Sequence, residues 1–377
     1  MLPPANVGER PRTGPVDCLC LIIAGRRDME GQPPSAVRRS KAPLRVKKQP
    51  PTPVERCSDS RGRLSLQPQY RMCRMPRILI SGASGLVGTA LVTALEKRGD
   101  EVYRLVRREP RNAFEICWDP MQDVPAELVS GFHVVIHLSG ETVAGRWTER
   151  KKRRIRDSRV VSTQNLALAL AKADTPPQTF ICASATGYYG NRGDEVLSEQ
   201  SASGQGFLAE TSREWEDATQ PAAQTADRVV NLRIGVVLSR KGGALKQMLL
   251  PFRLGLGGKI GSGRQWFSWI HVDDLVAAVL HIIEHSDLRG PVNMVSANPV
   301  TNAAFTKSLA EAVRRPAIFP VPAFMVRLAF GEFAEEGLLA SARVVPRKLV
   351  ENGFRFQYPE LRRALEDLLN RPLEAMS

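Results

Sequence analysis

The feature that most constrains the fold of this chain is a glycine-rich segment that follows a short apolar strand. Residues 77–81 read Arg-Ile-Leu-Ile-Ser, glycines follow at 82, 85 and 88, and apolar residues then recur at helical spacing. In a strand–turn–helix unit the three glycines permit a tight turn, a close approach to phosphate and close helix packing. The helix N-terminus attracts the negative charge. We therefore predict a pyrophosphate-binding turn made of Gly82, Ala83, Ser84, Gly85, Leu86, Val87 and Gly88.

Strand and helix patterns alternate after this turn. The expected strands cover residues 77–81, 101–106, 114–118, 133–138, 179–183 and 229–237. The expected helices cover residues 86–98, 148–173, 207–220 and 359–369. Continuous apolar runs such as 134–138 are typical of parallel strands buried on both faces. The patterns predict an α/β fold, namely a doubly wound parallel sheet (Rossmann) with a small mixed α/β C-terminal lobe.

The positive charge of the chain is concentrated near its start. Of the net charge of +14, the first 74 residues carry +9 (15 Lys+Arg against 6 Asp+Glu), which leaves +5 for the rest. The same segment holds 11 of the 27 prolines and has no sustained apolar periodicity. We interpret residues 1–74 as a basic, disordered or mis-annotated extension, because Met75 stands two residues before the first strand. Nucleic-acid binding through this segment is the minority interpretation.

The remaining composition indicates a globular enzyme-sized protein without a membrane segment. No apolar run reaches the roughly 18 residues of a membrane-spanning helix. The six cysteines lack disulfide or zinc spacing, and His271 with Asp273 lacks further ligands, so no metal site is expected. We divide the body into a nucleotide-binding domain (75–240) and a C-terminal substrate lobe (241–377) that shares some sheet with it. We expect a cytoplasmic location, a small-molecule substrate and, as an open alternative, a homodimer.

The residues after the second expected strand favour NADP over NAD. NAD-specific sites usually place Asp or Glu there, where the carboxylate accepts hydrogen bonds from the ribose hydroxyls. In this chain, strand 101–106 ends in Arg107 and Arg108, whose guanidinium groups suit a 2′-phosphate. Glu109 could still turn toward a ribose, so NAD remains the alternative.

Longer strings of the sequence resemble one protein superfamily. The glycine motif, residues 137–141 (His-Leu-Ser-Gly-Glu) and residues 156–159 (Arg-Asp-Ser-Arg) resemble extended short-chain dehydrogenases/reductases. Residues 184–190, 251–258 and 261–271 are similar to the "epimerase family protein" branch, which is nucleoside-diphosphate-sugar epimerase-like and carries a C-terminal domain of unknown function. The resemblance extends from about Met75 to Leu369.

This resemblance implies positions for several further cofactor-binding residues. Leu138 and Ser139 would line the adenine–ribose side, Arg159 would lie near the cofactor, and Val237 would lie near its nicotinamide end. His137 departs from the pattern, which more often has Asn at this position. We expect His137 to be a packed core residue.

The superfamily also implies a catalytic Ser, Tyr and Lys. The Tyr hydroxyl transfers a proton, the Lys lowers the pKa of the Tyr, and the Ser orients the substrate carbonyl. Ser184 ends the fifth expected strand, where this serine belongs, and Thr186 is an alternative. The Tyr and Lys places, however, hold Phe207 and Thr211, which have neither a transferable proton nor a charge to tune one.

Two hypotheses therefore remain open for the function. In the first, Tyr188 or Tyr189 replaces the missing acid beside Ser184, and Arg192 or Arg213 lowers the phenolic pKa. The protein would then be an NADP-dependent oxidoreductase or epimerase-like enzyme acting on a small or nucleotide-linked carbonyl or hydroxyl compound. In the second, the tyrosines only pack at a strand end, and the protein is a non-catalytic NADP(H) sensor or regulatory module.

Overall fold

The computed structural model describes residues 76–370, all within one structural unit. The interpretation of residues 1–74 lies outside the described residues.

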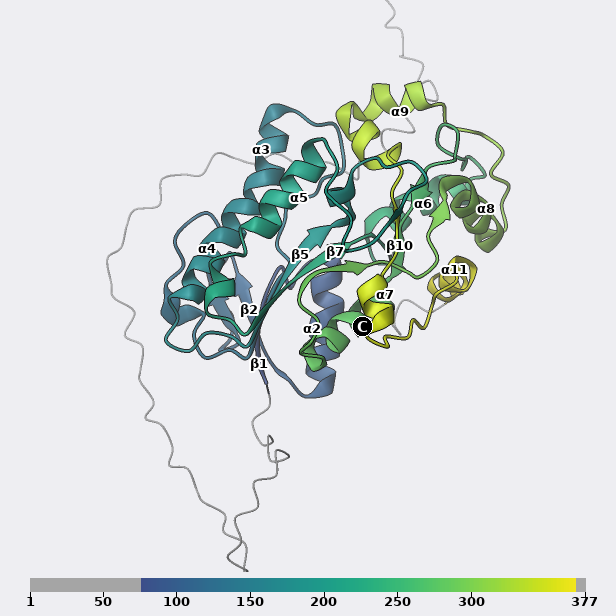
Figure 1. The fold of residues 1–377 in the computed structure, drawn as a ribbon. Coiled ribbons are helices and arrows are strands. Elements are labelled where there is room, and N and C mark those ends of the chain that lie inside the picture. Colours follow the sequence, from purple (N-terminus) through teal and green to yellow (C-terminus); the bar gives the residue numbers. More distant parts are fainter. Residues whose placement is uncertain (1–75, 371–377) are drawn as a thin grey trace, which may run out of the picture. The chain divides into compact units, whose positions relative to one another are not determined.

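A seven-stranded parallel sheet forms the centre of the described chain, with strand order β11-β7-β5-β4-β1-β2-β3 (Figure 1). Its strands are β1 (Arg77–Ser81), β2 (Glu101–Val106), β3 (Glu115–Cys117), β4 (Val134–His137), β5 (Thr179–Ala185), β7 (Arg228–Ile234) and β11 (Gly290–Met294). Every pair of neighbours is parallel. The predicted doubly wound Rossmann sheet is confirmed.

Helices cover both faces of this sheet, because successive apolar side chains of β1 point to opposite faces and all need burial. Ile78 and Ile80 pack with buried residues of α2 (Leu86–Arg98) and α7 (Val272–Glu284), whereas Leu79 packs with α4 (Val160–Ala171) and α5 (Phe207–Asp217). All three side chains are fully buried. Burial of apolar area on both faces stabilises the sheet at roughly 25 cal/mol per Å², and it aligns the carboxyl ends of the strands at one edge.

Two elements that the sequence predicts as continuous are divided. The helix expected over 148–173 is α3 (Glu149–Asp157) followed by α4, with the break at Ser158 and Arg159. The strand expected over 229–237 is β7 followed by β8 (Val236–Leu238), which pairs with β10 (Trp269–His271). Gly235 separates the two strands, and a Cβ there would lie 2.7 Å from the Ser268 carbonyl oxygen. Residues 148–173 contain no proline or glycine, and the apolar run of residues 229–237 continues past Gly235, so the local sequence did not reveal either break.

The residues after 240 complete the sheet and build a second core. Strand β11 pairs with β7 at the sheet edge, so residues on both sides of the expected boundary at 240 contribute strands to the central sheet. The second core is formed mainly by α6 (Gly243–Arg253), α8 (Asn302–Val313) and α11 (Leu361–Asn370). The remaining elements are η1 (Ala126–Leu128), η2 (Thr186–Tyr189), β6 (Val196–Leu197), η3 (Ala222–Gln224), β9 (Trp266–Phe267), β12 (Val300–Thr301), α9 (Ala323–Phe330), the π-helical turn η4 (Ala334–Leu338), β13 (Arg343–Val344) and α10 (Arg347–Glu351).

Among residues 76–370, no helix combines the length and the apolar character needed to cross a membrane.

Candidate nucleotide and substrate site

The turn between β1 and α2 has the backbone geometry that its glycines predict. Gly82 has φ 72°, and a Cβ there would lie 2.7 Å from the Leu138 carbonyl carbon. A Cβ at Gly88 would lie 2.2 Å from the Gly82 carbonyl oxygen. Gly85 is the N-cap of α2, and the helix begins with no side-chain cap and no acidic residue in its first turn. Its first N–H groups therefore have no intrahelical acceptor and can bind an anion.

The neighbouring residues of the predicted cofactor site gather around this turn. Leu138 and Ser139 follow β4 directly and contact Gly82 through their backbones. Val237 lies in β8, and the loop after it returns to α2: a Cβ at Gly243 would lie 3.2 Å from the Leu86 side chain and 3.5 Å from the Val237 carbonyl oxygen. The structure thus brings Leu86, Leu138, Ser139 and Val237 to the carboxyl edge of the sheet, on opposite sides of the turn.

His137, in β4, forms hydrogen bonds to β1, the strand that precedes the glycine turn, and to α4. Its Nδ1 lies 2.6 Å from Ser81 Oγ and its Nε2 lies 3.2 Å from Ser162 Oγ. Because Ser162 donates its own proton to the Ser158 carbonyl oxygen, Nε2–H donates to Ser162 and Nδ1 accepts from Ser81. Burial lowers the pKa of His137 to about 4, so the ring is neutral at physiological pH. The expectation of a packed core histidine is confirmed.

The two arginines after β2 differ in their partners. Arg108 donates to both oxygens of Glu115 at 2.7 and 2.8 Å, and these hydrogen bonds lower the pKa of the Glu115 carboxyl to about 2. Arg107 is exposed and has no ion pair or side-chain hydrogen bond among the described residues. The prediction treated the two residues as a guanidinium pair, whereas only Arg107 is available to an incoming anion.

Arg159 is a half-buried cation beside the end of β4. It donates to the Ile155 carbonyl oxygen at 3.0 Å, and its guanidinium carbon lies 5.1 Å from the ring centroid of Trp215. A Cβ on Gly140 would lie 3.4 Å from that guanidinium group. Burial lowers the pKa of Arg159 to about 10, so the group remains charged near neutral pH. A partly desolvated cation at this edge suits a bound anion.

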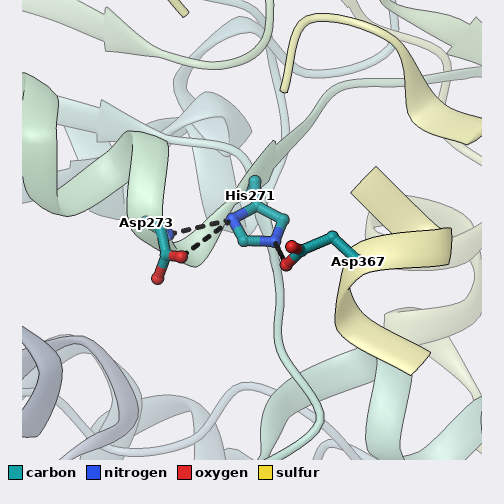
Figure 2. A group of neighbouring side chains, drawn as sticks. All are labelled: His271, Asp273 and Asp367. Carbon is teal, nitrogen blue, oxygen red and sulfur yellow. Dashed lines mark hydrogen bonds and ion pairs between the residues drawn. The ribbon is translucent and has the colours of Figure 1, made fainter. Parts of the chain in front are cut away.

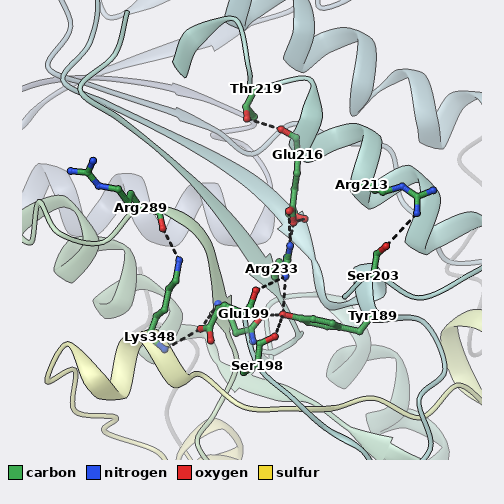
Figure 3. Close-up of polar contacts among 12 residues, drawn as sticks. Tyr189, Ser198, Glu199, Ser203, Arg213, Glu216, Thr219, Arg233, Arg289 and Lys348 are labelled. Atoms are coloured by element: carbon green, nitrogen blue, oxygen red, sulfur yellow. Dashed lines mark hydrogen bonds and ion pairs between the residues drawn. The ribbon is translucent and has the colours of Figure 1, made fainter. Parts of the chain in front are cut away.

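The candidate catalytic serine, Ser184, is buried and belongs to a polar network. Figure 3 shows three other members of this network, Glu216, Arg233 and Tyr189, pointing toward one another. Ser184 Oγ donates to Glu216 Oε1 at 2.7 Å. The same carboxylate accepts two hydrogen bonds of 2.8 Å from Arg233, which is 3% exposed. Burial alone would lower the pKa of Arg233, but the hydrogen bonds to Glu216 raise it above its usual value. We call Ser184, Tyr189, Glu216, Arg233 and Asn293 the Arg233 network.

Tyr189 lies entirely inside this network. Its hydroxyl donates toward Asn293 Oδ1 at 2.7 Å and the Ser198 carbonyl oxygen at 2.9 Å, and it accepts from Arg233 at 3.0 Å. The side chain is fully buried, and this burial raises the pKa of the Tyr189 hydroxyl to about 12. The hydroxyl donates to internal acceptors, its oxygen accepts from Arg233, and the whole side chain is shielded from water, so its proton has no path to a substrate. The hypothesis that Tyr189 is catalytic therefore does not fit the structure.

Tyr188 differs from its neighbour because it is only partly buried. The guanidinium carbon of Arg233 lies 3.5 Å from the centroid of its ring, a cation–π contact. The sequence suggested Arg192 or Arg213 as the cation beside the tyrosines, and this is wrong. Arg192 forms two hydrogen bonds to Glu195, and Arg213 donates to Ser203. Nothing in the local sequence distinguishes Arg233, which lies 45 positions after Tyr188.

The positions expected for Tyr and Lys hold packing residues. Phe207 packs against Trp147 at a centroid distance of 5.1 Å, and Thr211 is 3% exposed. The N-terminus of α5 is capped from far along the chain, because Glu336 accepts from the backbone N–H groups of Phe207 (3.0 Å) and Leu208 (2.8 Å). This end of α5 therefore joins the C-terminal lobe. Thr186, the alternative to Ser184, is partly exposed.

The structure also brings together one cluster that the sequence did not (Figure 2). His271 Nδ1 accepts from the Asp273 backbone N–H at 3.1 Å, and Nε2 lies 3.4 Å from Asp367 Oδ2. Asp367 also accepts from Tyr358, whose ring stacks on His271 at 4.0 Å. Because both ring nitrogens face protein partners, we interpret the cluster as a connection between the start of α7 and α11.

The site thus combines an anion-binding turn with a partly open tyrosine. The glycine turn lies beside the end of β4, Arg159 is half-buried near that strand end, and Arg107 is exposed after β2. Tyr188 is the member of the predicted catalytic set whose hydroxyl has no hydrogen bond within residues 76–370. The fold and the turn define a dinucleotide-binding protein of the Rossmann class.

Comparison with known families agrees with this class. Residues 78–295 match the NAD dependent epimerase/dehydratase family, and residues 321–368 match a domain of unknown function, DUF1731. The first match covers more than half of the chain. The chain belongs to the NAD dependent epimerase/dehydratase family, as its resemblance implied.

Individual relatives extend the match over the whole described body. An epimerase family protein of Mycobacterium tuberculosis is 43% identical over 297 residues, which are 78% of this chain and 98% of the relative. Epimerase family protein SDR39U1 of Mus musculus is 40% identical over 298 residues, covering 78% and 99%. The crystal structure of human epimerase family protein SDR39U1 with NADPH superposes with a TM-score of 0.72 at 34% identity, covering 78% of this chain and 100% of that one.

Proposed function

We propose that this protein binds NADP(H) at the β1–α2 turn and is an oxidoreductase or epimerase-like enzyme acting on a small or nucleotide-linked carbonyl or hydroxyl substrate. The observation that carries the proposal is the uncapped N-terminus of α2 beside a glycine turn in which side chains are excluded at Gly82 and Gly88. Such a turn leaves room for a pyrophosphate and supplies N–H donors to it.

The preference for NADP rests on the cation at the end of β2. Arg107 is exposed and unpaired within residues 76–370, so it can form charge-assisted hydrogen bonds to a 2′-phosphate. Arg108 is already neutralised by Glu115. The human relative with NADPH bound supports the same choice.

The chemistry at the substrate end would involve Tyr188. A bound nicotinamide supplies hydride transfer to or from a carbonyl or hydroxyl carbon. The protein must then hold or move the proton on the substrate oxygen. Tyr188 is partly exposed, and the Arg233 cation packs against its ring. Ser184 and Glu216 would hold Arg233 in this place.

A titration with NADPH and NADH tests the cofactor half of the proposal. Arg107→Ala should weaken NADPH binding roughly tenfold or more and leave NADH binding nearly unchanged, because it removes one charge-assisted contact to the 2′-phosphate. Arg108→Ala is the matched control and should have a smaller effect, since its guanidinium already binds Glu115. Equal effects of the two variants would contradict the role of Arg107, and no binding of either nucleotide would contradict the proposal.

The catalytic half is tested by turnover of carbonyl compounds with NADPH. Tyr188→Phe keeps the ring against Arg233 and removes only the hydroxyl, so it should abolish turnover and preserve NADPH affinity. Full activity of this variant would exclude Tyr188 as the proton carrier.

A non-catalytic NADP(H) sensor is the second candidate function. The observation that favours it is the packing of Phe207 and Thr211 at the two positions where the superfamily places its Tyr and Lys. In this case, partner proteins captured from an extract should change with the NADP/NADPH ratio, and Tyr188→Phe should not alter that change. Capture that is indifferent to the nucleotide would exclude the sensor.

A further inference from the structure

A groove on the C-terminal lobe gathers positive charge at a distance in sequence from the glycine turn. It has a volume of about 700 Å³ and is lined by residues of α8, by residues that follow α8 and by Lys259. Its lining residues are Lys259, Ala303, Thr306, Lys307, Ala310, Glu311, Arg314, Arg315, Pro316, Ala317, Ile318 and Pro320. We call this the α8 groove. All of these residues except Lys259 lie between the two family matches, which end at 295 and begin at 321.

The four cations of the α8 groove have no counter-ion. Within residues 76–370, none of Lys259, Lys307, Arg314 and Arg315 has an ion pair or a side-chain hydrogen bond, and the groove contains a single acid, Glu311. Some exposed arginines elsewhere on the same lobe are paired, as in Arg327–Glu335, Arg347–Glu351 and Arg362–Glu366, whereas others, such as Arg253 and Arg363, are not paired with any described residue. Four unpaired cations around one cavity create a positive field that favours a multiply charged anion.

Part of the groove lining is apolar. Ala303 and Ala310 are seven positions apart, so they lie on one face of α8, and their side chains are short; we call these two residues the alanine floor. Pro316, Ala317 and Ile318 add further apolar lining, and Ile318 is 70% exposed. No aromatic residue lines the cavity, so the lining offers no platform on which a nucleotide base could stack.

Arg314, one of the residues that line the α8 groove, has an unusual backbone conformation. Arg314 has φ 54° and is the single non-glycine residue with positive φ in the described part of the chain. It ends α8 at the position where glycine is the usual residue. A strained position held by a charged residue on a cavity rim is typical of a ligand site.

We propose that the α8 groove is a second binding site, which takes a phosphate monoester carrying an apolar, non-aromatic chain. The phosphate contacts Lys259, Lys307, Arg314 and Arg315, and the chain lies on the alanine floor and Ile318. A soluble phosphate ester and a phospholipid headgroup both present this chemistry. The volume falls in the range of small-molecule sites.

Calorimetric titration of the full chain with hexyl phosphate tests this proposal, with inorganic phosphate as the comparison. Hexyl phosphate should bind saturably and more tightly than inorganic phosphate. The Lys259→Gln/Arg315→Gln double variant should weaken it roughly tenfold or more, since two charge-assisted contacts are lost. Arg150→Gln on α3 is the matched control, because Arg150 is exposed and outside the groove, and it should bind as the parent does. An equal loss in the control overturns the proposal.

Arg314→Gly separates binding from folding. Glycine accepts positive φ, so this variant should melt at a higher temperature than the parent and still bind hexyl phosphate more weakly. Arg107→Ala should leave hexyl phosphate binding intact, which distinguishes the α8 groove from the cofactor turn.

If the parent binds neither hexyl phosphate nor vesicles of phosphatidic acid in phosphatidylcholine, the proposal is wrong. Binding to vesicles alone, lost in the double variant, assigns the phosphate to a lipid, whereas binding of the soluble ester assigns it to a free metabolite.

Discussion

The turn after β1 and the region after β5 lie at the same carboxyl edge of one sheet, but they are built in different ways. The turn is defined by backbone: Gly82 and Gly88 exclude side chains, and α2 begins without a cap. The region after β5 is defined by side chains, because Ser184, Glu216 and Arg233 join one another across three elements. The comparison teaches that a cofactor-binding function can be retained by glycines while the reacting residues beside it are replaced.

The largest expected effect is a loss of stability when the buried ion pair between Arg233 and Glu216 is broken. Arg233→Met leaves Glu216 charged and buried, so it should reduce the free energy of unfolding by about 3–5 kcal/mol. Urea denaturation measures this loss. The double variant Arg233→Met/Glu216→Leu should recover most of the stability, because it removes both charges.

The Arg233→Met variant also tests whether the two regions act independently, when NADPH is titrated under conditions in which the variant remains folded. Its affinity should stay within about threefold of the parent, since distant sites contribute independently. A large loss of NADPH affinity would show that the two regions are coupled.

A second pair of variants probes the turn itself. Gly88→Ala places a methyl group 2.2 Å from the Gly82 carbonyl oxygen, so the turn must shift and NADPH binding should weaken roughly a hundredfold. Gly85→Ala is the matched control, since its Cβ would lie 3.3 Å from the same oxygen and a small adjustment suffices. It should lose less than about tenfold. Similar losses in both variants would contradict the separate roles of the two glycines.

The pH dependence of stability reports on the histidine beneath the turn. The pKa of His137 is lowered to about 4 in the folded protein, so between pH 6.5 and pH 4 the unfolded chain binds the extra proton. Stability should therefore rise with pH through this window, by up to about 3 kcal/mol from this group. His137→Asn removes the titrating ring. Denaturation of the variant at pH 4.5 and pH 7 should show a smaller difference than in the parent.

The smallest expected effect distinguishes the two adjacent tyrosines. Tyr189→Phe removes a buried hydroxyl with three partners and should cost about 1–2 kcal/mol of stability. Tyr188→Phe retains the ring against Arg233 and should change stability by less than about 0.5 kcal/mol. Thermal melts of both variants measure this. The reverse order would place Tyr188, not Tyr189, in the structural role.

The fold and the turn could be predicted because their determinants are local. Glycines at 82, 85 and 88 act within a few residues, and buried parallel strands leave continuous apolar runs. The breaks at Ser158 and Gly235 could not be predicted, since no proline or glycine interrupts residues 148–173 and the apolar run of residues 229–237 continues past Gly235. Gly235 is required by the close approach of Ser268, 33 positions later in the sequence.

The substrate side could be predicted only in part. The sequence shows directly that Phe207 and Thr211 replace the expected Tyr and Lys. It does not show that Arg233, rather than Arg192 or Arg213, faces Tyr188, because this contact depends on how β7 lies against β5. It also gives no indication that Arg108 pairs with Glu115, which leaves Arg107 as the available cation.

The cap that Glu336 places on α5 has a consequence for the order in which the protein is made. Phe207 and Leu208 are synthesised well before Glu336, which follows Phe207 by 129 positions. A nascent chain on the ribosome therefore completes β5, α5 and β7 while the first amides of α5 have only water as a partner. Glu336 caps this end of the helix only after all strands of the central sheet have been synthesised. A chain released before residue 336 would have the nucleotide turn and every residue of α5 but would lack the cap on that helix.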